Sequence, residues 1–474
     1  MTPADSDPRR RLSGWLHRDH TRGNLVTSMW VLALPLLASN VLGGLVFQVV
    51  DLGFLSRLGE EAVTAVIVTN QSLRQVLFML VMGASFGAQA LIARSVGSGR
   101  PGEADHIAGQ VVVLGFAASA VFAVLGTVFA PEMLATMRVA PEVLEIGVPY
   151  VRLSFALNFG FVFLFLFNAI LNGAGDATTP LLVAVVQTAV GLLGEWVFIF
   201  GNWGAPALGI QGVAWGVACG HVVAGAIAVS MLFRGTSRVH LRLRHFAPDA
   251  AVLRRLVALS WPPAIQLLSA FVVNVIFIRL MGELSSNAQA AYSIGLRISM
   301  MGPMLAFPLA GAAATLVGQN LGAGRIRRAW QSIGLGLAVN LGLLWSIGAG
   351  MALFRREIMA LLASDPEVIA IGSEMLLFQA AAFALWAFYF VCFRSLQGAG
   401  QVAVPMVASI LTAVFVSLPT GLLLSGPLGW GHTGIFAATV VGSAVNTLVT
   451  GGWIVSGRWA RRTAPSAAPG PEPT

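Results

Sequence analysis

The sequence predicts an all-α integral membrane protein with twelve transmembrane helices in two six-helix lobes, related by a parallel internal repeat. Composition predicts the membrane class, because 57% of the 474 residues are hydrophobic and 10% are charged. A soluble domain carries roughly 25% charged residues, so this chain cannot cover itself with polar surface. Short motifs that recur about 225 residues apart predict the duplication.

Apolar stretches of sufficient length occur twelve times along the chain. About 20 apolar residues are needed to cross a hydrocarbon core of about 30 Å. The predicted spans are 26–55, 62–96, 104–130, 146–172, 177–201, 208–233, 254–281, 288–321, 328–354, 368–396, 403–425 and 433–457. The first run is too long for a cleaved signal sequence, so it is expected to stay as a span.

The arginines predict the orientation of these spans. With the N-terminus in the cytoplasm, nineteen arginines fall near cytoplasmic loops and tails and four fall on the other side. This positive-inside bias favours an even number of spans with both termini in the cytoplasm. We therefore expect a multi-pass protein of a bacterial cytoplasmic (inner) membrane.

The repeat is read from paired motifs. GSGR at 97–100 matches GAGR at 322–325, and LNGAG at 171–175 matches LQGAG at 396–400, both with an offset of 225. LGI at 208–210 is matched with TGI at 433–435 at the same offset, whereas earlier pairs such as Leu58-Gly59 and Met281-Gly282 are offset by 223. Six spans per half give the two halves the same orientation, which is typical of parallel-repeat transporters with a substrate cavity between the repeats. The alternative is a duplicated but static membrane protein.

The repeat and the composition together predict the domain boundaries. The predicted parts are a basic cytoplasmic tail at 1–24, a first lobe at 25–233, an Arg-rich cytoplasmic linker at 234–252, a second lobe at 253–457 and a disordered tail at 458–474.

Two acidic residues fall inside predicted spans, where a carboxylate is costly and is seldom found without a function. Asp51 lies on the first span and Glu195 on the fifth. These spans run in the same direction and both acids fall toward their outer ends, so the two carboxyls are expected to face one another. A carboxyl in a dry site favours its neutral form, which suits a group that takes up and releases a proton. The alternatives are an Asp51 paired with Arg74 and a Glu195 that serves packing.

Other function classes find little support. The two cysteines, Cys219 and Cys392, form no metal-binding motif. GASFG at 83–87 fits the nucleophile motif G-x-S-x-G, and His221 would be its base, but Ser85 falls inside a long membrane helix rather than at a strand-to-helix turn. We therefore expect no enzyme, no cofactor, no metal and no nucleic-acid partner.

The order of several motifs resembles the multidrug and toxic compound extrusion (MATE) family, from Leu32 to about Val455. The stretches that carry the resemblance are LALPLL, VVDLGFLSRLG, GASFGAQALIARSVGSGR, AILNGAGDATTPLL, LGIQGVAWG, PLAGAAATLVGQNLGAGR and FRSLQGAGQVAVP. The resemblance implies two six-helix lobes and efflux of amphipathic, often cationic compounds against proton or sodium influx.

The resemblance also implies roles for single positions. Asp51 stands at the family's acid of the first helix, and Glu195 stands where the family usually has Asp. Sodium-type relatives have Asn and Thr at the positions of Gly191 and Val217, and acids near Ala270 and Trp386. The loss of these groups favours proton coupling and a DinF-like branch, with sodium less favoured.

The predicted function is a secondary active multidrug antiporter that exchanges cationic compounds for protons by alternating access. The proton-coupling residues are Asp51 and Glu195, and bending of the first helix is assigned to Pro35. Membrane lipids and small lipophilic cations are the expected partners, and the protein is expected to be a monomer. The alternatives are a sodium-coupled drug antiporter and a lipid-linked oligosaccharide flippase. Residues predicted to line the substrate cavity are Gln48, Tyr150, Asn168 and Gln187.

Overall fold

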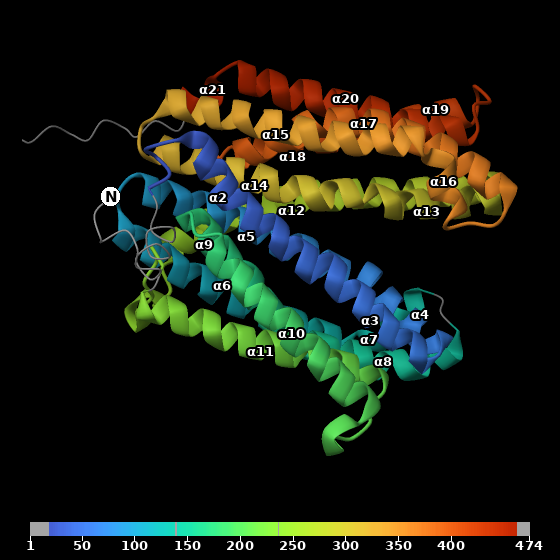
Figure 1. The fold of residues 1–474 in the computed structure, drawn as a ribbon, viewed down its shortest axis with the longest axis horizontal. Helices are drawn as coiled ribbons and strands as arrows, with labels where there is room; N and C mark the ends of the chain where they lie inside the picture. Colours follow the sequence, from blue (N-terminus) through green and yellow to red (C-terminus); the bar gives the residue numbers. More distant parts are fainter. Residues whose placement is uncertain (1–18, 138–139, 236, 462–474) are drawn as a thin grey trace, which may run out of the picture. The chain divides into compact units, whose positions relative to one another are not determined.

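The computed structural model describes residues 19–137, 140–235 and 237–461, and every regular element in these ranges is helical (Figure 1). Eleven of the described helices are long and apolar enough to cross a membrane, and a pair bent by 44° supplies a twelfth crossing. The predicted all-α membrane fold is therefore confirmed. The predicted tails 1–24 and 458–474 lie largely outside the described residues.

The chain divides into two compact units. Within the described residues, the first unit comprises 19–20 with Trp30–Trp261, and the second comprises Thr21–Met29 with 262–461. Two of the three divisions fall inside helices, namely α2 (Leu25–Asn40) and α12 (Ala250–Leu284), and the third falls in the turn between His20 and Thr21. The predicted lobe and linker boundaries stay predictions.

The helices of the first unit follow the predicted spans closely, but the first, second and fourth spans are interrupted. After α2 come α3 (Phe47–Leu55), α4 (Glu60–Val68), α5 (Arg74–Gly97), α6 (Pro101–Val128), α7 (Ala130–Thr136), α8 (Pro141–Ala156), α9 (Asn158–Ala174), α10 (Thr178–Phe200) and α11 (Ile210–Arg234). The π-helical turns Val41–Val46 and Thr69–Leu73 join α2 to α3 and α4 to α5, and short 3₁₀ turns occur at Ser56–Leu58 and Asn202–Gly204.

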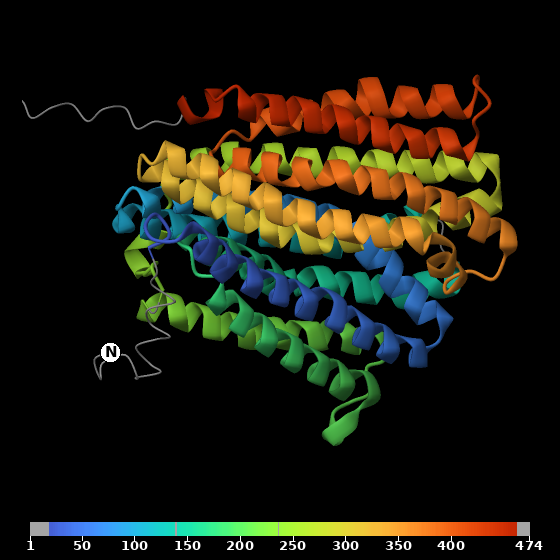
Figure 2. The ribbon, with the colours of Figure 1, turned by 45° about the horizontal axis from the view of Figure 1, so that its top comes forward.

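The second unit contains the counterparts of these helices. They are the later part of α12, α13 (Ser286–Ser299), α14 (Met301–Gly322), α15 (Ile326–Leu353), α16 (Arg355–Ala360), α17 (Pro366–Gly398), α18 (Ala403–Thr412), α19 (Leu418–Ser425), α20 (His432–Val455) and α21 (Arg458–Arg461). A π-helical turn, Ala413–Ser417, joins α18 to α19. Figures 1 and 2 both show α15, α17 and α20 side by side along their lengths.

The repeat is visible in the backbone of the turns. Gly99 and Gly324 have φ of +72° and +71°, and they occupy the same place in GSGR and GAGR. Such left-handed backbone strongly favours glycine. Helices α11 and α20 begin directly after Gly209 and Gly431, both with φ of +53°. These two glycines are 222 residues apart, so the predicted pairing of LGI with TGI at an offset of 225 is wrong at this point.

Small residues allow α10 and α11 to approach closely in the first unit. Gly212, Gly216 and Gly220 are spaced four residues apart on α11, and a Cβ on Gly216 would lie 2.2 Å from the backbone nitrogen of Glu195. Spaced small residues of this kind let membrane helices pack backbone against backbone. The backbone around Glu195 is therefore held directly against α11.

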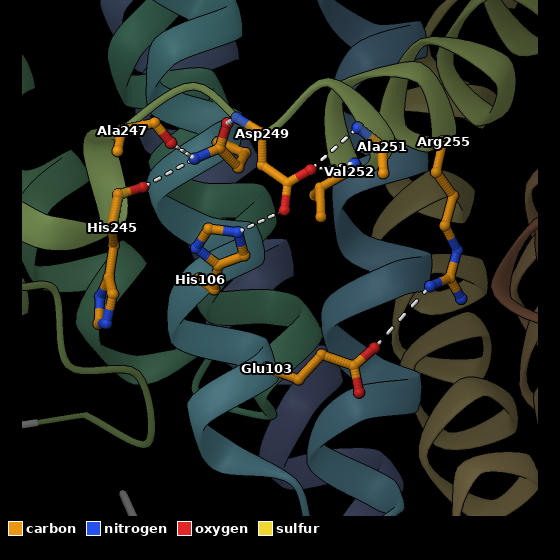
Figure 3. Close-up of polar contacts among 9 residues, drawn as sticks. Glu103, His106, His245, Ala247, Asp249, Ala251, Val252 and Arg255 are labelled. Carbon is orange, nitrogen blue, oxygen red and sulfur yellow. Dashed lines mark hydrogen bonds and ion pairs between the residues drawn. The ribbon is translucent and has the colours of Figure 1, made fainter.

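The Arg-rich linker is fastened to α6 of the first unit (Figure 3). Gln110 donates to the carbonyls of His245 and Ala247 at 2.8 and 2.7 Å and accepts from the Asp249 N–H at 2.9 Å. His106 lies 3.0 Å from the Asp249 carboxylate, and the His240 N–H donates to Asp105 at 2.8 Å. The linker thus forms an ordered strap, defined here as residues 239–249, across the end of α6.

Candidate functional site

Asp51 lies on α3, one turn after the π-helical turn Val41–Val46. Its Oδ1 atom is buried and has no hydrogen-bond partner among the described residues, although the side chain as a whole is partly exposed. π-helical turns leave a local irregularity in the hydrogen-bond ladder and are frequent at functional sites. Asp51 is therefore a carboxyl group on an irregular membrane helix, with one oxygen withheld from solvent.

Glu195 lies on α10 and is completely buried. Neither of its carboxyl oxygens has a hydrogen-bond partner in the part of the chain that the structure describes. α3 packs on α10, and the Asp51 carboxyl is near enough for its charge to act on Glu195. The structure thus brings the two predicted acids together within the first unit.

Arg74 does not neutralise these acids. Its guanidinium donates to the Asn70 side chain at 3.3 Å and lies 5.6 Å from the centre of the Phe161 ring. No ion pair joins it to Asp51 or Glu195 among the described residues. The alternative interpretation, in which Asp51 forms a structural ion pair with Arg74, is therefore not supported by a contact between the two side chains. Tyr150 is 1% exposed and lies within electrostatic reach of both Arg74 and Asp51.

The other predicted cavity residues occupy different environments. Asn168 on α9 has a buried Oδ1 without a partner among described residues, whereas Gln48 on α3 is exposed. Gln187 on α10 lies 3.3 Å from His221 Nε2 on α11. Their assignment to a substrate cavity stays a prediction.

The first membrane helix changes geometry where bending was expected. Pro35 lies inside α2, and Gly43 and Gly44 lie inside the π-helical turn that follows. Proline removes a backbone donor, and an irregular turn removes regular hydrogen bonds, so both loosen the helix at these points. The role of Pro35 in a conformational change stays a prediction.

Gly191, one of the positions at which the resemblance implies a side-chain oxygen in sodium-type relatives, is closely packed here. A Cβ on Gly191 would already lie 3.2 Å from the Phe47 ring, which leaves little room for a larger side chain. Within the described ranges, no group of three or more His, Cys, Asp or Glu residues is arranged to hold a metal ion.

The motif that fits a nucleophile elbow lies in the middle of α5. The Ser85 hydroxyl donates to the Val81 carbonyl at 2.9 Å, within its own helix. His221, its suggested base, instead contacts Gln187. The two residues therefore do not form a nucleophile–base pair.

The second unit contains a different set of polar groups. Its acid Glu374 is partly exposed and bound by His432 at 3.2 Å and Thr433 at 2.6 Å. Deep in the unit, Arg394 donates to Gln397, which donates to Gln266 at 3.2 Å. Gln266 donates in turn to the Tyr389 hydroxyl at 2.8 Å.

Sequence reasoning missed two polar residues of this unit, Asn274 and Gln379. The signal for Asn274 was available, because QVVDLGF at 48–54 aligns with FVVNVIF at 271–277 at the offset of 223. Asn274 is therefore the counterpart of Asp51. No pattern in the sequence marks Gln379 as a lining residue, because its surroundings come from four other helices.

Within the described residues, a duplicated set of eleven to twelve membrane-crossing helices with unpaired buried carboxyls is typical of multi-pass membrane transporters of the parallel-repeat class. The MatE family profile matches residues 35–197 and 262–423, one match in each half of the chain. The chain belongs to the MatE family.

Relatives and solved structures agree with this membership. The chain is 26% identical over 443 residues to "Probable multidrug resistance protein YoeA" of Bacillus subtilis, with 90% of this chain and 92% of that protein covered. It is 24% identical over 440 residues to "Probable multidrug resistance protein NorM" of Thermotoga maritima, with 91% of this chain and 92% of that protein covered. A crystal structure of a MATE protein in the bent conformation has a TM-score of 0.86 and 19% identity, with 94% of this chain and 98% of that chain covered.

Proposed function

We propose that this transporter exports amphipathic, mostly cationic compounds in exchange for protons by alternating access. The observation that carries the proposal is the pair of carboxyl groups in the first unit, Asp51 and Glu195, which have buried oxygens without partners among the described residues. A permanently charged, unpaired carboxylate in such a place is very costly. A carboxyl that alternates between a proton and a cationic substrate is neutralised in both states.

The proposed cycle uses this alternation. In the outward-open state Asp51, supported by Glu195, takes up a proton and releases the cationic substrate. Protonation removes charge from the first helix, which bends near Pro35 or the Gly43-Gly44 pair. In the inward-open state the proton leaves to the cytoplasm, and a new cation competes for the carboxylates.

The substrate class is supported by the names of relatives and by the chemistry of the acids. Two relatives are named multidrug resistance proteins. Two adjacent carboxyls attract cations, and apolar membrane helices favour lipophilic ones. We further propose a monomer in a bacterial inner membrane with both termini in the cytoplasm, since the arginines are concentrated on that side.

Transport in vesicles tests the coupling ion. Vesicles that contain purified protein are loaded so that a proton gradient or a sodium gradient alone drives movement of ethidium, a fluorescent cation. We expect a proton gradient to drive transport by the wild type, and Asp51→Asn to reduce it to the level of protein-free vesicles. Glu374→Gln is the matched control, because Glu374 is also an acid of a membrane helix but is paired.

The outcomes separate the alternatives. Proton-driven transport that persists in Asp51→Asn would contradict the proposed role of this residue. Transport driven by sodium alone would contradict the ion assignment and support the sodium-coupled alternative.

A further inference from the structure

The second unit contains a cavity of about 100 Å³ between α12, α13, α14, α17 and α20. Four aromatic side chains contribute to its wall, and two of them, Tyr292 and Phe436, stack with their planes 6° apart. Trp386 and Phe378 complete the aromatic part. An apolar cavity of 150 Å³ in another protein binds benzene, so a space of this order takes a single ring.

This cavity is the repeat counterpart of the acid site in the first unit. At the offsets that the turns and helices establish, Asn274 corresponds to Asp51, and Met375 corresponds to Tyr150. Thr439 corresponds to Val217, at the offset of 222 that Gly209 and Gly431 fix. The place of the acid Asp51 in the first unit is therefore taken by the neutral Asn274 in this cavity.

Gln379 supplies an unused polar group in this cavity. It is 4% exposed, it lines the cavity from α17, and its Nε2 has no hydrogen-bond partner among the described residues. A buried carboxamide donor without a partner costs roughly 1–3 kcal/mol, which a ligand with an acceptor atom removes. Two of the lining hydroxyls are already engaged, since Ser299 donates to Gly295 and Thr439 to Ile435.

The chemistry of the lining selects the occupant. No residue that lines the cavity is an acid, so no carboxylate stabilises an ammonium group there. The Gln379 Nε2 group donates and matches a carbonyl oxygen or an aromatic ring nitrogen. The thioethers of Met300 and Met375 provide adaptable apolar contacts around a ring.

We propose that the second unit binds a neutral, single-ring aromatic group that carries a hydrogen-bond acceptor, with Gln379 as its donor. The inference rests on the proposed function only in that such a group arrives as part of a transported compound. It adds a neutral recognition site to a transporter whose first unit recognises charge.

Photolabelling with benzophenone tests the site in the full-length purified protein. Benzophenone carries an aryl ketone and, when irradiated, inserts into nearby C–H bonds, so label on Met300 or Met375 is located by peptide mass spectrometry. Three single-ring competitors are compared: acetophenone, α-methylstyrene and phenyltrimethylammonium. The first two have nearly the same shape, but only acetophenone has an acceptor, and the third is a cation.

In the wild type we expect acetophenone to block the labelling at about 3- to 10-fold lower concentration than α-methylstyrene, the ratio that one neutral hydrogen bond gives. In Gln379→Leu, acetophenone and α-methylstyrene should block the labelling at equal concentrations. Gln331→Leu changes an exposed glutamine on α15 and should keep the wild-type ratio of the two blocking concentrations. Ser299→Leu fills the cavity and should abolish the label on both methionines.

Three results overturn the proposal: label that avoids both methionines, an acetophenone preference that survives Gln379→Leu, or phenyltrimethylammonium competing as well as acetophenone. Labelling does not depend on transport, so Asp51→Asn should be labelled as the wild type is. Failure of proton-driven efflux and failure of this site are therefore distinguishable.

Discussion

The two units share one fold but differ in the residues that they place at equivalent positions. The first unit has Asp51 on its first helix and Glu195 on its fifth, and the second has Asn274 and Thr420 at the matching positions. Since the second unit forms the same helices without either acid, the fold does not need carboxyls at these places. The second unit thus serves as an internal control for the proposed function of the two acids.

The largest expected effect comes from making the first unit resemble the second at its fully buried acid. Glu195→Gln should reduce proton-driven efflux of ethidium to the level of protein-free vesicles, because the carboxyl can no longer take up a proton. Its thermal unfolding midpoint should stay unchanged or rise, since an unpaired ionisable group is removed from an apolar site. Thr420→Val, at the counterpart position, is the control and should leave efflux intact. A Glu195→Gln variant with full efflux would mean that Asp51 acts alone.

A swap of the acid between the units sharpens the comparison. The double variant Asp51→Asn with Asn274→Asp has the same number of acids as the wild type, but they lie in different units. We expect no recovery of efflux over Asp51→Asn alone, because the acid in the second unit has no partner corresponding to Glu195. The measurement is the same vesicle assay with both variants at equal protein content. Recovered efflux would show that an acid at either of the two repeat-related positions is sufficient and that it does not need a partner such as Glu195.

A smaller effect is expected where α10 meets α11. Gly216→Ala places a Cβ 2.2 Å from the Glu195 nitrogen, so the helices must separate. Overpacking of this kind costs ~1–3 kcal/mol, and chemical or thermal unfolding in detergent measures it. Gly225→Ala on the same helix is the control, because its Cβ would meet Phe163 at an ordinary 3.6 Å. Equal stability of the two variants would contradict the described contact. In the second unit the counterpart of Gly216 is already an alanine, Ala438.

The smallest effect concerns the strap, which has no described counterpart in the second unit. The His106 side chain, with the N–H groups of Val252 and Ala251, holds the pKa of Asp249 below its usual value. A carboxyl with a lowered folded-state pKa stabilises the fold above its unfolded pKa, about 4, and loses this contribution as the pH falls through the folded value. The unfolding midpoint of Asp249→Asn should therefore lie slightly below that of the wild type at pH 6, and the difference should shrink below about pH 4. If the difference between the two unfolding midpoints grew as the pH falls, the lowered pKa of Asp249 would be contradicted.

The spans and the repeat were predictable because both depend on local sequence. Hydropathy marks each crossing, and turn glycines such as Gly99 and Gly324 mark the duplication. The bend between α8 and α9 was not predicted, since no proline or glycine stands at Leu157, where the helix breaks. The division of the second span by a π-helical turn at Thr69–Leu73 was missed for the same reason.

The two acids of the candidate site were visible in the sequence because an acid stands out in an apolar run. The cavity of the second unit was not visible, since amides and aromatic residues are common in membrane helices. The cavity is recognised as a candidate binding site from the side chains that meet across helices, and from the fact that the Gln379 Nε2 has no hydrogen-bond partner among the described residues. Such information appears only when the helices are packed.

The fastening of the strap to α6 has a consequence for the integrity of the chain. Gln110, His106 and Asp105 hold the strap without any covalent bond. A protease that cuts between Arg234 and Ser237 would therefore sever the backbone but leave the later fragment docked on the earlier one through these side chains. The two fragments should copurify after nicking, so the peptide bonds between Arg234 and Ser237 are a favourable position for a split protein or an inserted reporter.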